Sequence, residues 1–138
     1  MPLFVYPLLI FALVQIIKLI IETIHGRFSW NHLFSNGGMP SSHSAFITSA
    51  ATVIALAEGI GSPLFVLACA VALIVVWDSF TIRYQLGFHG LIINRLVKEL
   101  PDMREYKYPL LSERLGHKLG EVIVGVIIGI GVTLLLLG

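Results

Sequence analysis

The stretch "GGMPSSHSAF", residues 37–46, separates two long apolar runs and concentrates turn-forming and polar residues in a short space. Its glycines let the incoming chain turn, and Pro40 followed by serines is typical of a helix start, because a serine side chain can cap free backbone amides. Such an N-terminus also attracts anions, phosphate above all. The stretch therefore predicts a helix starting near His43, with either an ordinary cap or a phosphate cradle that includes Ser41 and Ser42.

The sequence around this stretch has the composition of a membrane protein. Of its 138 residues, 57% are hydrophobic and only 12% are charged, whereas soluble domains contain about 25% charged residues. We therefore expect one all-α domain over residues 1–138, built as a bundle of about four transmembrane helices. The segments long and apolar enough to cross about 30 Å of hydrocarbon are residues 3–24, 43–60, 63–83 and 118–137.

The loops between these spans differ in charge. Residues 25–42 and 84–117 fall on one side of the membrane, and the 61–62 turn falls on the other side with both termini. Within the second loop, residues 87–100 have the spacing of a short amphipathic helix at the interface. The positive-inside rule makes the side of the two long loops cytoplasmic, because they contain or border Arg27, Arg83, Arg95, Lys98, Arg104, Lys107, Arg114 and Lys118. A net charge of +1 gives no reason to expect a nucleic-acid partner.

Ionisable side chains are rare within membrane spans and mark functional sites by default. Here most of them lie near the same end of their helices: Lys18, Glu22, His43, Asp78, Arg83, His117 and Glu121. His117 and Glu121 are four residues apart, so in a helix they would share a face, either as an interfacial polar pair or with the carboxylate orienting a nucleophilic imidazole. Asp78 is spaced to pair with Arg83.

The cations of this cluster suit an anionic ligand. Lys18 and Arg83, with Arg27 as a further candidate, would surround the serine-rich helix start. The chain has one cysteine and no H-E-x-x-H pattern, so we expect the site to work without a metal or other cofactor.

These motifs resemble those of the type-2 phosphatidic acid phosphatase superfamily, which includes the vanadium haloperoxidases, and most of all its small four-span bacterial branch. "PSSH" at 40–43 is similar to the family's Pro-Ser-Gly-His motif, with Ser42 in the glycine position. "HKLGEVIVG" at 117–125 is similar to His-x3-Asp-x3-Gly, with Glu121 in place of aspartate. Lys18 fits the lysine of the first motif, and the arginine before the second histidine corresponds to Arg83 or to the nearer Arg114.

The resemblance implies a mechanism and a cellular location. His117 would attack phosphorus and form a phosphohistidine, Glu121 would orient it, and His43 would act as general acid and base. Lys18, Arg83 and the first amides of the helix would stabilise the transition state. The protein would be a multi-pass protein of the bacterial inner membrane, and its thin four-helix bundle favours a homodimer.

Three functions are consistent with these residues. The first is a phosphatase for a lipid phosphate monoester or diphosphate, such as phosphatidylglycerol phosphate, phosphatidic acid or polyprenyl diphosphate. The second is a binder or transporter that holds a lipid headgroup or an anion without hydrolysis. The third is a structural membrane subunit.

Overall fold

The computed structural model describes residues 2–26, 38–100, 109–113 and 115–138. These residues form helices and no strands, as the all-α prediction requires. The helices are α1 (Val5–Ile24), α3 (Ser42–Glu58), α4 (Pro63–Phe80), α5 (Ile82–Glu99) and α6 (Leu119–Leu137). Among the described residues, three helical stretches are long and apolar enough to cross a membrane: α1, α6 and the combined stretch of α4 and α5. The span predicted at residues 43–60, which forms α3, is not one of them, because α3 has only 17 residues.

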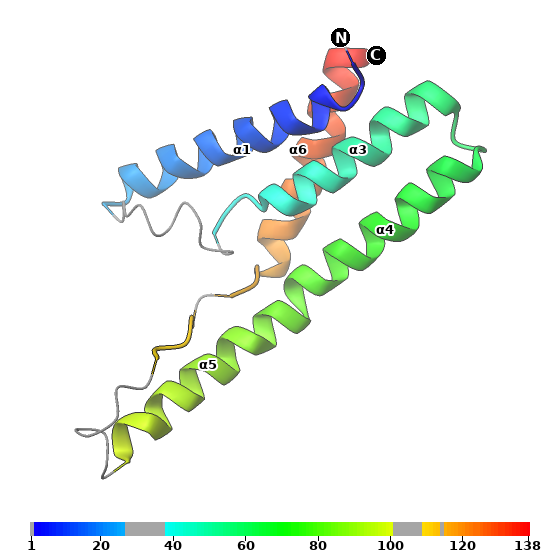
Figure 1. Cartoon of the computed structure of the whole chain (residues 1–138). Helices are drawn as coiled ribbons and strands as arrows, with labels where there is room; N and C mark the ends of the chain where they lie inside the picture. The colour runs from blue at the N-terminus through cyan, green and yellow to red at the C-terminus, as the bar shows by residue number, and fades with distance from the viewer. Residues whose placement is uncertain (1, 27–37, 101–108, 114) are drawn as a thin grey trace.

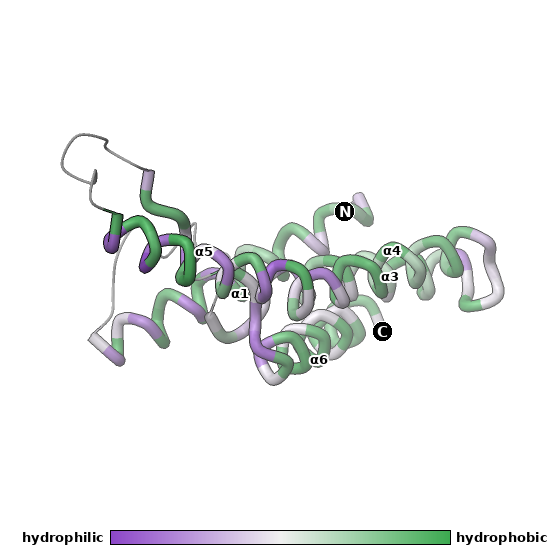
Figure 2. Tube along the Cα trace, turned by 90° about the horizontal axis from the view of Figure 1, so that it is seen from below, coloured by the Kyte–Doolittle hydropathy of each residue, from purple (hydrophilic) through white to green (hydrophobic). Residues whose placement is uncertain are grey.

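The bundle consists of α1, α3, α4 and α6, with both chain termini and the α3–α4 turn toward one end and α5 extending beyond the other (Figure 1). Figure 2 shows long hydrophobic stretches along the bundle and hydrophilic residues concentrated toward the end where α5 leaves it. The predicted spans match these helices to within three residues at each end, because local signals set several boundaries. At α4, for example, Ser62 Oγ accepts from Phe65 N–H at 3.2 Å and Pro63 opens the first turn.

The central helix of the bundle is α3, which packs against α1, α4 and α6. Its contact with α6 is close because α6 presents glycines there. A Cβ at Gly125 would collide with the backbone of Ser41, and one at Gly129 would collide with Thr48 and Ala45. The small-residue spacing on α6 therefore packs helices within the chain, as such spacings do in membranes.

The helix predicted over 87–100 is longer than expected and directly continues α4 beyond the bundle (Figure 1). Only Thr81 separates the two helices. α5 stops at Glu99 because Leu100 is extended, with ψ of 136°, as expected of the residue before a proline.

One face of α5 carries the segment that leads to α6. We call residues 111–113 and 115–117 of this segment the strap. Asn94 donates to Leu111 O at 2.9 Å and accepts from Leu111 N–H at 3.0 Å. A Cβ at Gly87 would lie 2.9 Å from Leu115 O, and one at Gly90 would lie 2.8 Å from the carbonyl oxygen of the strap residue Ser112. The glycines thus allow the strap to run directly against the helix.

Candidate active site

The polar side chains predicted to converge do so at the end of the bundle opposite the termini. Lys18 comes from α1, His43 from the first turn of α3, Arg83 from the start of α5, and His117 from the strap. Lys18 and His117 are buried, with 5% and 4% of their surfaces exposed. A membrane-embedded bundle carrying a buried lysine and a buried histidine at one end has the features of a site for a charged ligand.

His43 and His117 are the centre of this cluster. Their ring centroids lie 6.3 Å apart with the planes at 81°, which is too far for a direct hydrogen bond between the rings. The Nδ1 atom of each ring is buried and has no hydrogen-bond partner within the described part of the chain. An unpartnered buried polar atom costs about 1–3 kcal/mol, and in native proteins such atoms require an explanation such as a catalytic role.

The position of His117 is fixed by its backbone. Its N–H donates to Ser79 O near the end of α4 at 2.9 Å. The preceding Gly116 has φ of +86°, and a Cβ there would collide with the backbone of Tyr84 and Arg83. The turn at Gly116 therefore brings His117 to the junction of α4 and α5, next to Arg83.

The surroundings of His117 keep its ring neutral. Burial, followed by the positive charges of His43, Lys18 and Arg83, lowers the pKa of His117 from its ordinary 6.5 to about 4. A neutral imidazole has a ring nitrogen lone pair available for attack, so His117 is in its nucleophilic form at neutral pH.

The expected contact between Glu121 and His117 is not found among the described residues. Glu121 Oε2 instead accepts from the N–H of Lys118 at 3.1 Å and caps α6. The expectation required His117 and Glu121 to lie on one helix, but α6 begins at Leu119. His117 therefore precedes the helix, and the four-residue spacing does not place the two side chains on one face.

Ser41 also has a different role from the expected phosphate contact. Ser41 is fully buried, its N–H donates to Glu121 O at 3.1 Å, and its Oγ accepts from Ser44 N–H at 3.4 Å. The bond to Glu121 O holds the start of α3 against α6, and the bond from Ser44 N–H caps α3. Ser42 and His43 lie in the first turn of α3, where backbone N–H groups have no partner within the helix and the positive end of the helix stabilises an anion.

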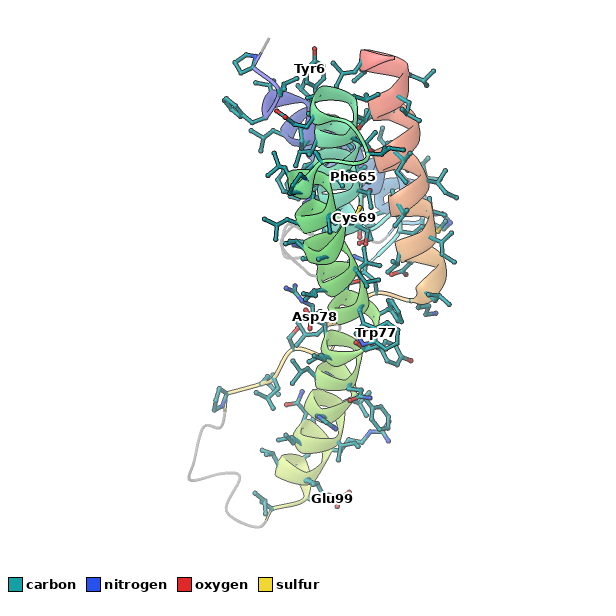
Figure 3. The ribbon with its side chains drawn as sticks, turned by 90° about the vertical axis from the view of Figure 1, so that its right-hand side faces the viewer. Tyr6, Phe65, Cys69, Trp77, Asp78 and Glu99 are labelled. Carbon is teal, nitrogen blue, oxygen red and sulfur yellow. The ribbon has the colours of Figure 1, made fainter. Side chains whose placement is uncertain are left out.

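Two cations face this helix start. Lys18 is covered by Gly38, because a Cβ at Gly38 would lie 2.9 Å from Lys18 Cε and 3.6 Å from Lys18 Nζ. Arg83 donates through Nε to Asp78 Oδ2 at 2.9 Å, the ion pair that the sequence spacing suggested. This bond uses one of the five N–H donors of arginine. Figure 3 shows Asp78 near the end of α4, beside the junction with α5. Arg27 and Arg114 lie outside the described residues.

Three contributors to the cluster were missed by the sequence reasoning. Ser79 anchors His117 through a backbone carbonyl, which has no sequence signal. Gly116 allows the chain to turn just before His117, and its position in the sequence is the signal that could have indicated this turn. Phe11 packs edge-on against the His43 ring at a centroid distance of 6.5 Å, and in the sequence it is one of many apolar residues of α1.

Comparisons with known proteins show the family of the chain. A family model described as the divergent PAP2 family matches residues 1–132, and the chain belongs to that family. It is similar to the uncharacterized membrane protein YuiD of Bacillus subtilis (strain 168), with 39% identity over 140 residues that cover 93% of this chain and 87% of the relative. No solved structure matches the chain.

Proposed function

We propose that the protein is a membrane phosphatase that hydrolyses a lipid phosphate monoester or diphosphate through a phosphohistidine intermediate. The observation that carries this proposal is the pair of buried histidines with unpartnered Nδ1 atoms, set among Lys18, Arg83 and the start of α3. Membership of the divergent PAP2 family supports a phosphatase relationship.

The first half-reaction uses the two histidines on opposite sides of the phosphorus. Neutral His117 attacks the phosphorus in line, and the bond from phosphorus to the lipid oxygen breaks. With the negatively charged phosphate bound beside it, which favours the protonated imidazole, His43 gives its proton to the leaving oxygen.

The second half-reaction returns both histidines to their starting states. Water attacks the phosphohistidine, His43 accepts a proton from that water, and the bond between His117 and phosphorus breaks to release phosphate. In both transition states Lys18, Arg83 and the amides of Ser42 and His43 stabilise the equatorial oxygens. Glu121 acts indirectly by fixing the start of α6.

Two features favour a lipid over a water-soluble phosphate. The cluster lies at the ends of membrane-length helices, where a phosphate headgroup meets the bilayer surface while its acyl chains remain in hydrocarbon. His43 also contacts Phe11, which packs edge-on against Phe46 at 6.2 Å. These rings provide an apolar wall beside the general acid. Phosphatidylglycerol phosphate, phosphatidic acid and polyprenyl diphosphate are the candidate substrates.

The test is phosphate release by the purified protein from vesicles containing each of these lipids. His117→Ala and His43→Ala should each reduce turnover at least about 10³-fold, because His117 is the nucleophile and His43 is the general acid and base. His25→Ala is the matched control, because His25 is exposed and bonds only locally to Ile21 O at 2.7 Å. Normal turnover by the His117→Ala protein would contradict the mechanism.

A lipid-headgroup binder is the second candidate. It is favoured by the capping role of Glu121, which leaves His117 Nδ1 without an orienting carboxylate among the described residues. Saturable binding of a phosphorylated lipid, with no phosphate release from any lipid of the panel, would support this function over hydrolysis.

We further propose that the protein resides in the bacterial inner membrane with its site facing the cytoplasm. In a Cys69→Ser background, Gly61→Cys in the α3–α4 turn should react with an impermeant thiol reagent in intact cells. Glu99→Cys, at the far end of α5 (Figure 3), should resist it until the cells are opened. The reverse labelling pattern would invert the topology and favour a substrate of the outer leaflet.

A further inference from the structure

The buried residues of α5 lie along one line of the helix, and this line meets the strap. They are Gly87, Gly90 and Asn94. At about 100° per residue they fall within about 60° of one another and of Arg83 around the helix. A side chain at either glycine would collide with a carbonyl oxygen of the strap. This side of α5 is therefore shaped to hold the strap close to its backbone.

Asn94 fixes which residue of the strap lies at this point of α5. Its Nδ2 donates to Leu111 O and to Glu113 Oε1, both at 2.9 Å, and its Oδ1 accepts from Leu111 N–H at 3.0 Å. Asn94 is 5% exposed, and these bonds use both protons of its amide group. Because one carboxamide pairs with both backbone groups of Leu111, a shift of the strap along α5 would lose these bonds together.

The other end of the strap carries His117. Its backbone N–H donates to Ser79 O at 2.9 Å, so the strap is bonded at both ends. Its ring Nδ1 has no hydrogen-bond partner within the described part of the chain. Glu121, which was expected to orient this ring, caps α6 instead. The placement of the His117 ring therefore depends on the backbone that carries it.

We propose that Asn94 is a positioning residue, which sets through the strap the place from which His117 attacks phosphorus. This inference rests on the proposed function. One residue of extended chain spans about 3.3 Å, whereas a misplacement of a reacting group by about 1 Å can cost about 10²-fold in rate. A small movement of the strap would thus be enough to inactivate the site, while the packing of α1, α3, α4 and α6 is kept.

Asn94→Asp tests this role with the least change in shape. The new carboxylate can still accept from Leu111 N–H, but it cannot donate, and it would face Leu111 O and the carboxylate of Glu113. We expect kcat for phosphate release to fall about 10²-fold. KM should change less than about threefold, because Lys18, Arg83 and the start of α3 still bind the phosphate.

A second substitution separates positioning from general damage. In the double variant Asn94→Asp with Glu113→Gln, the introduced amide can donate to the introduced carboxylate, so kcat should recover about tenfold. Gln85→Glu is the matched control, because it makes the same change from amide to carboxylate at an exposed position of α5 on the side away from the strap. It should change kcat less than about twofold.

The reactivity of His117 gives a readout that does not depend on turnover. The His117 residue is 4% exposed, so in monodisperse wild-type protein it should react slowly with diethyl pyrocarbonate, as located by mass spectrometry. Asn94→Asp should speed this modification about tenfold or more, and Gln85→Glu should not. Gly87→Ala, which pushes a Cβ against the strap, should act like Asn94→Asp and replaces it if that variant does not fold.

The two readouts also separate this inference from the proposed function. Absence of phosphate release by the wild-type protein from every lipid tested would contradict the phosphatase, while the modification rates would still show whether Asn94 holds His117 in place. Wild-type kcat and wild-type His117 reactivity in Asn94→Asp or in Gly87→Ala would overturn the positioning role. An equally large effect of Gln85→Glu, or no recovery in the double variant, would overturn it too.

Discussion

α3 and α4 are neighbours of similar length with opposite surroundings. α3 buries small and polar residues, among them Ser44, Ala45, Thr48 and Ser49. α4 is rich in leucine, isoleucine and valine, yet only Ala72 and Ser79 are buried. In a membrane, large apolar side chains are already well solvated by lipid, so the close contacts between helices use small residues and interhelical hydrogen bonds. Within this bundle, small size and polarity therefore mark the interior better than hydrophobicity does.

The most direct test of the close packing between α3 and α6 is to replace one glycine of α6 by a larger residue. Gly129→Ala places a Cβ against Thr48 and Ala45 of α3, and overpacking of this kind costs about 1–3 kcal/mol or more. We expect a large loss of thermal stability in detergent, measured by the fraction that stays monodisperse after heating.

Gly131→Ala is the matched control for that substitution. Gly131 is two residues beyond Gly129 and so lies about 200° around α6 from it, and a Cβ there meets nothing within 4 Å. Replacing glycine by alanine within a helix gains about 1 kcal/mol of helix propensity, so this variant should be as stable as the wild type or more so. Similar losses in both variants would show that α3 and α6 do not pack as described.

The pH dependence of stability tests whether His117 of the strap is buried in the folded protein. His117 is neutral when folded because its pKa is about 4, while in the unfolded chain it titrates near 6.5. As the pH falls, the unfolded state therefore binds the proton before the folded state does. The free energy of unfolding decreases between about pH 6.5 and 4, by about 3 kcal/mol in all. His117→Gln should remove this part of the acid sensitivity, measured as the difference in melting temperature between pH 7 and pH 4.5. Equal acid sensitivity in the two proteins would place His117 in contact with water.

The sequence predicted some features of this fold and missed others for identifiable physical reasons. The lengths of α1, α4 and α6 were predictable because the bilayer sets them, whereas the start of α5 was not, and the starts after Ser41 and Ser62 follow from serine capping. The role of Glu121 was not predictable because it depends on whether the helix starts at His117 or at Leu119, a small shift within the uncertainty of boundary signals.

The backbone contacts of the site and the packing of the strap could not be predicted from the sequence for the same reason. The fit of Gly87 and Asn94 against the strap joins residues that are distant in sequence, and no local pattern encodes such a contact. The convergence of Lys18, His43, Arg83 and His117 was accessible because each lies near a helix end on the same side of the membrane. Which backbone groups hold them there required the three-dimensional structure.

The smallest expected effect concerns one hydrogen bond inside the α3–α6 contact. Thr133 Oγ1 donates to Ser49 Oγ at 2.8 Å, with both side chains fully buried. Thr133→Val keeps the shape but leaves Ser49 without this partner, which should cost about 1 kcal/mol, since hydrogen bonds between membrane helices contribute about 0.6 kcal/mol on average. Adding Ser49→Ala removes the unpartnered hydroxyl, so the double variant should recover part of that loss. Unfolding measurements on the two single variants and the double variant give the coupling energy directly. A coupling energy of zero would mean that the small side chains of α3, rather than their hydroxyls, account for its tight contact with α6.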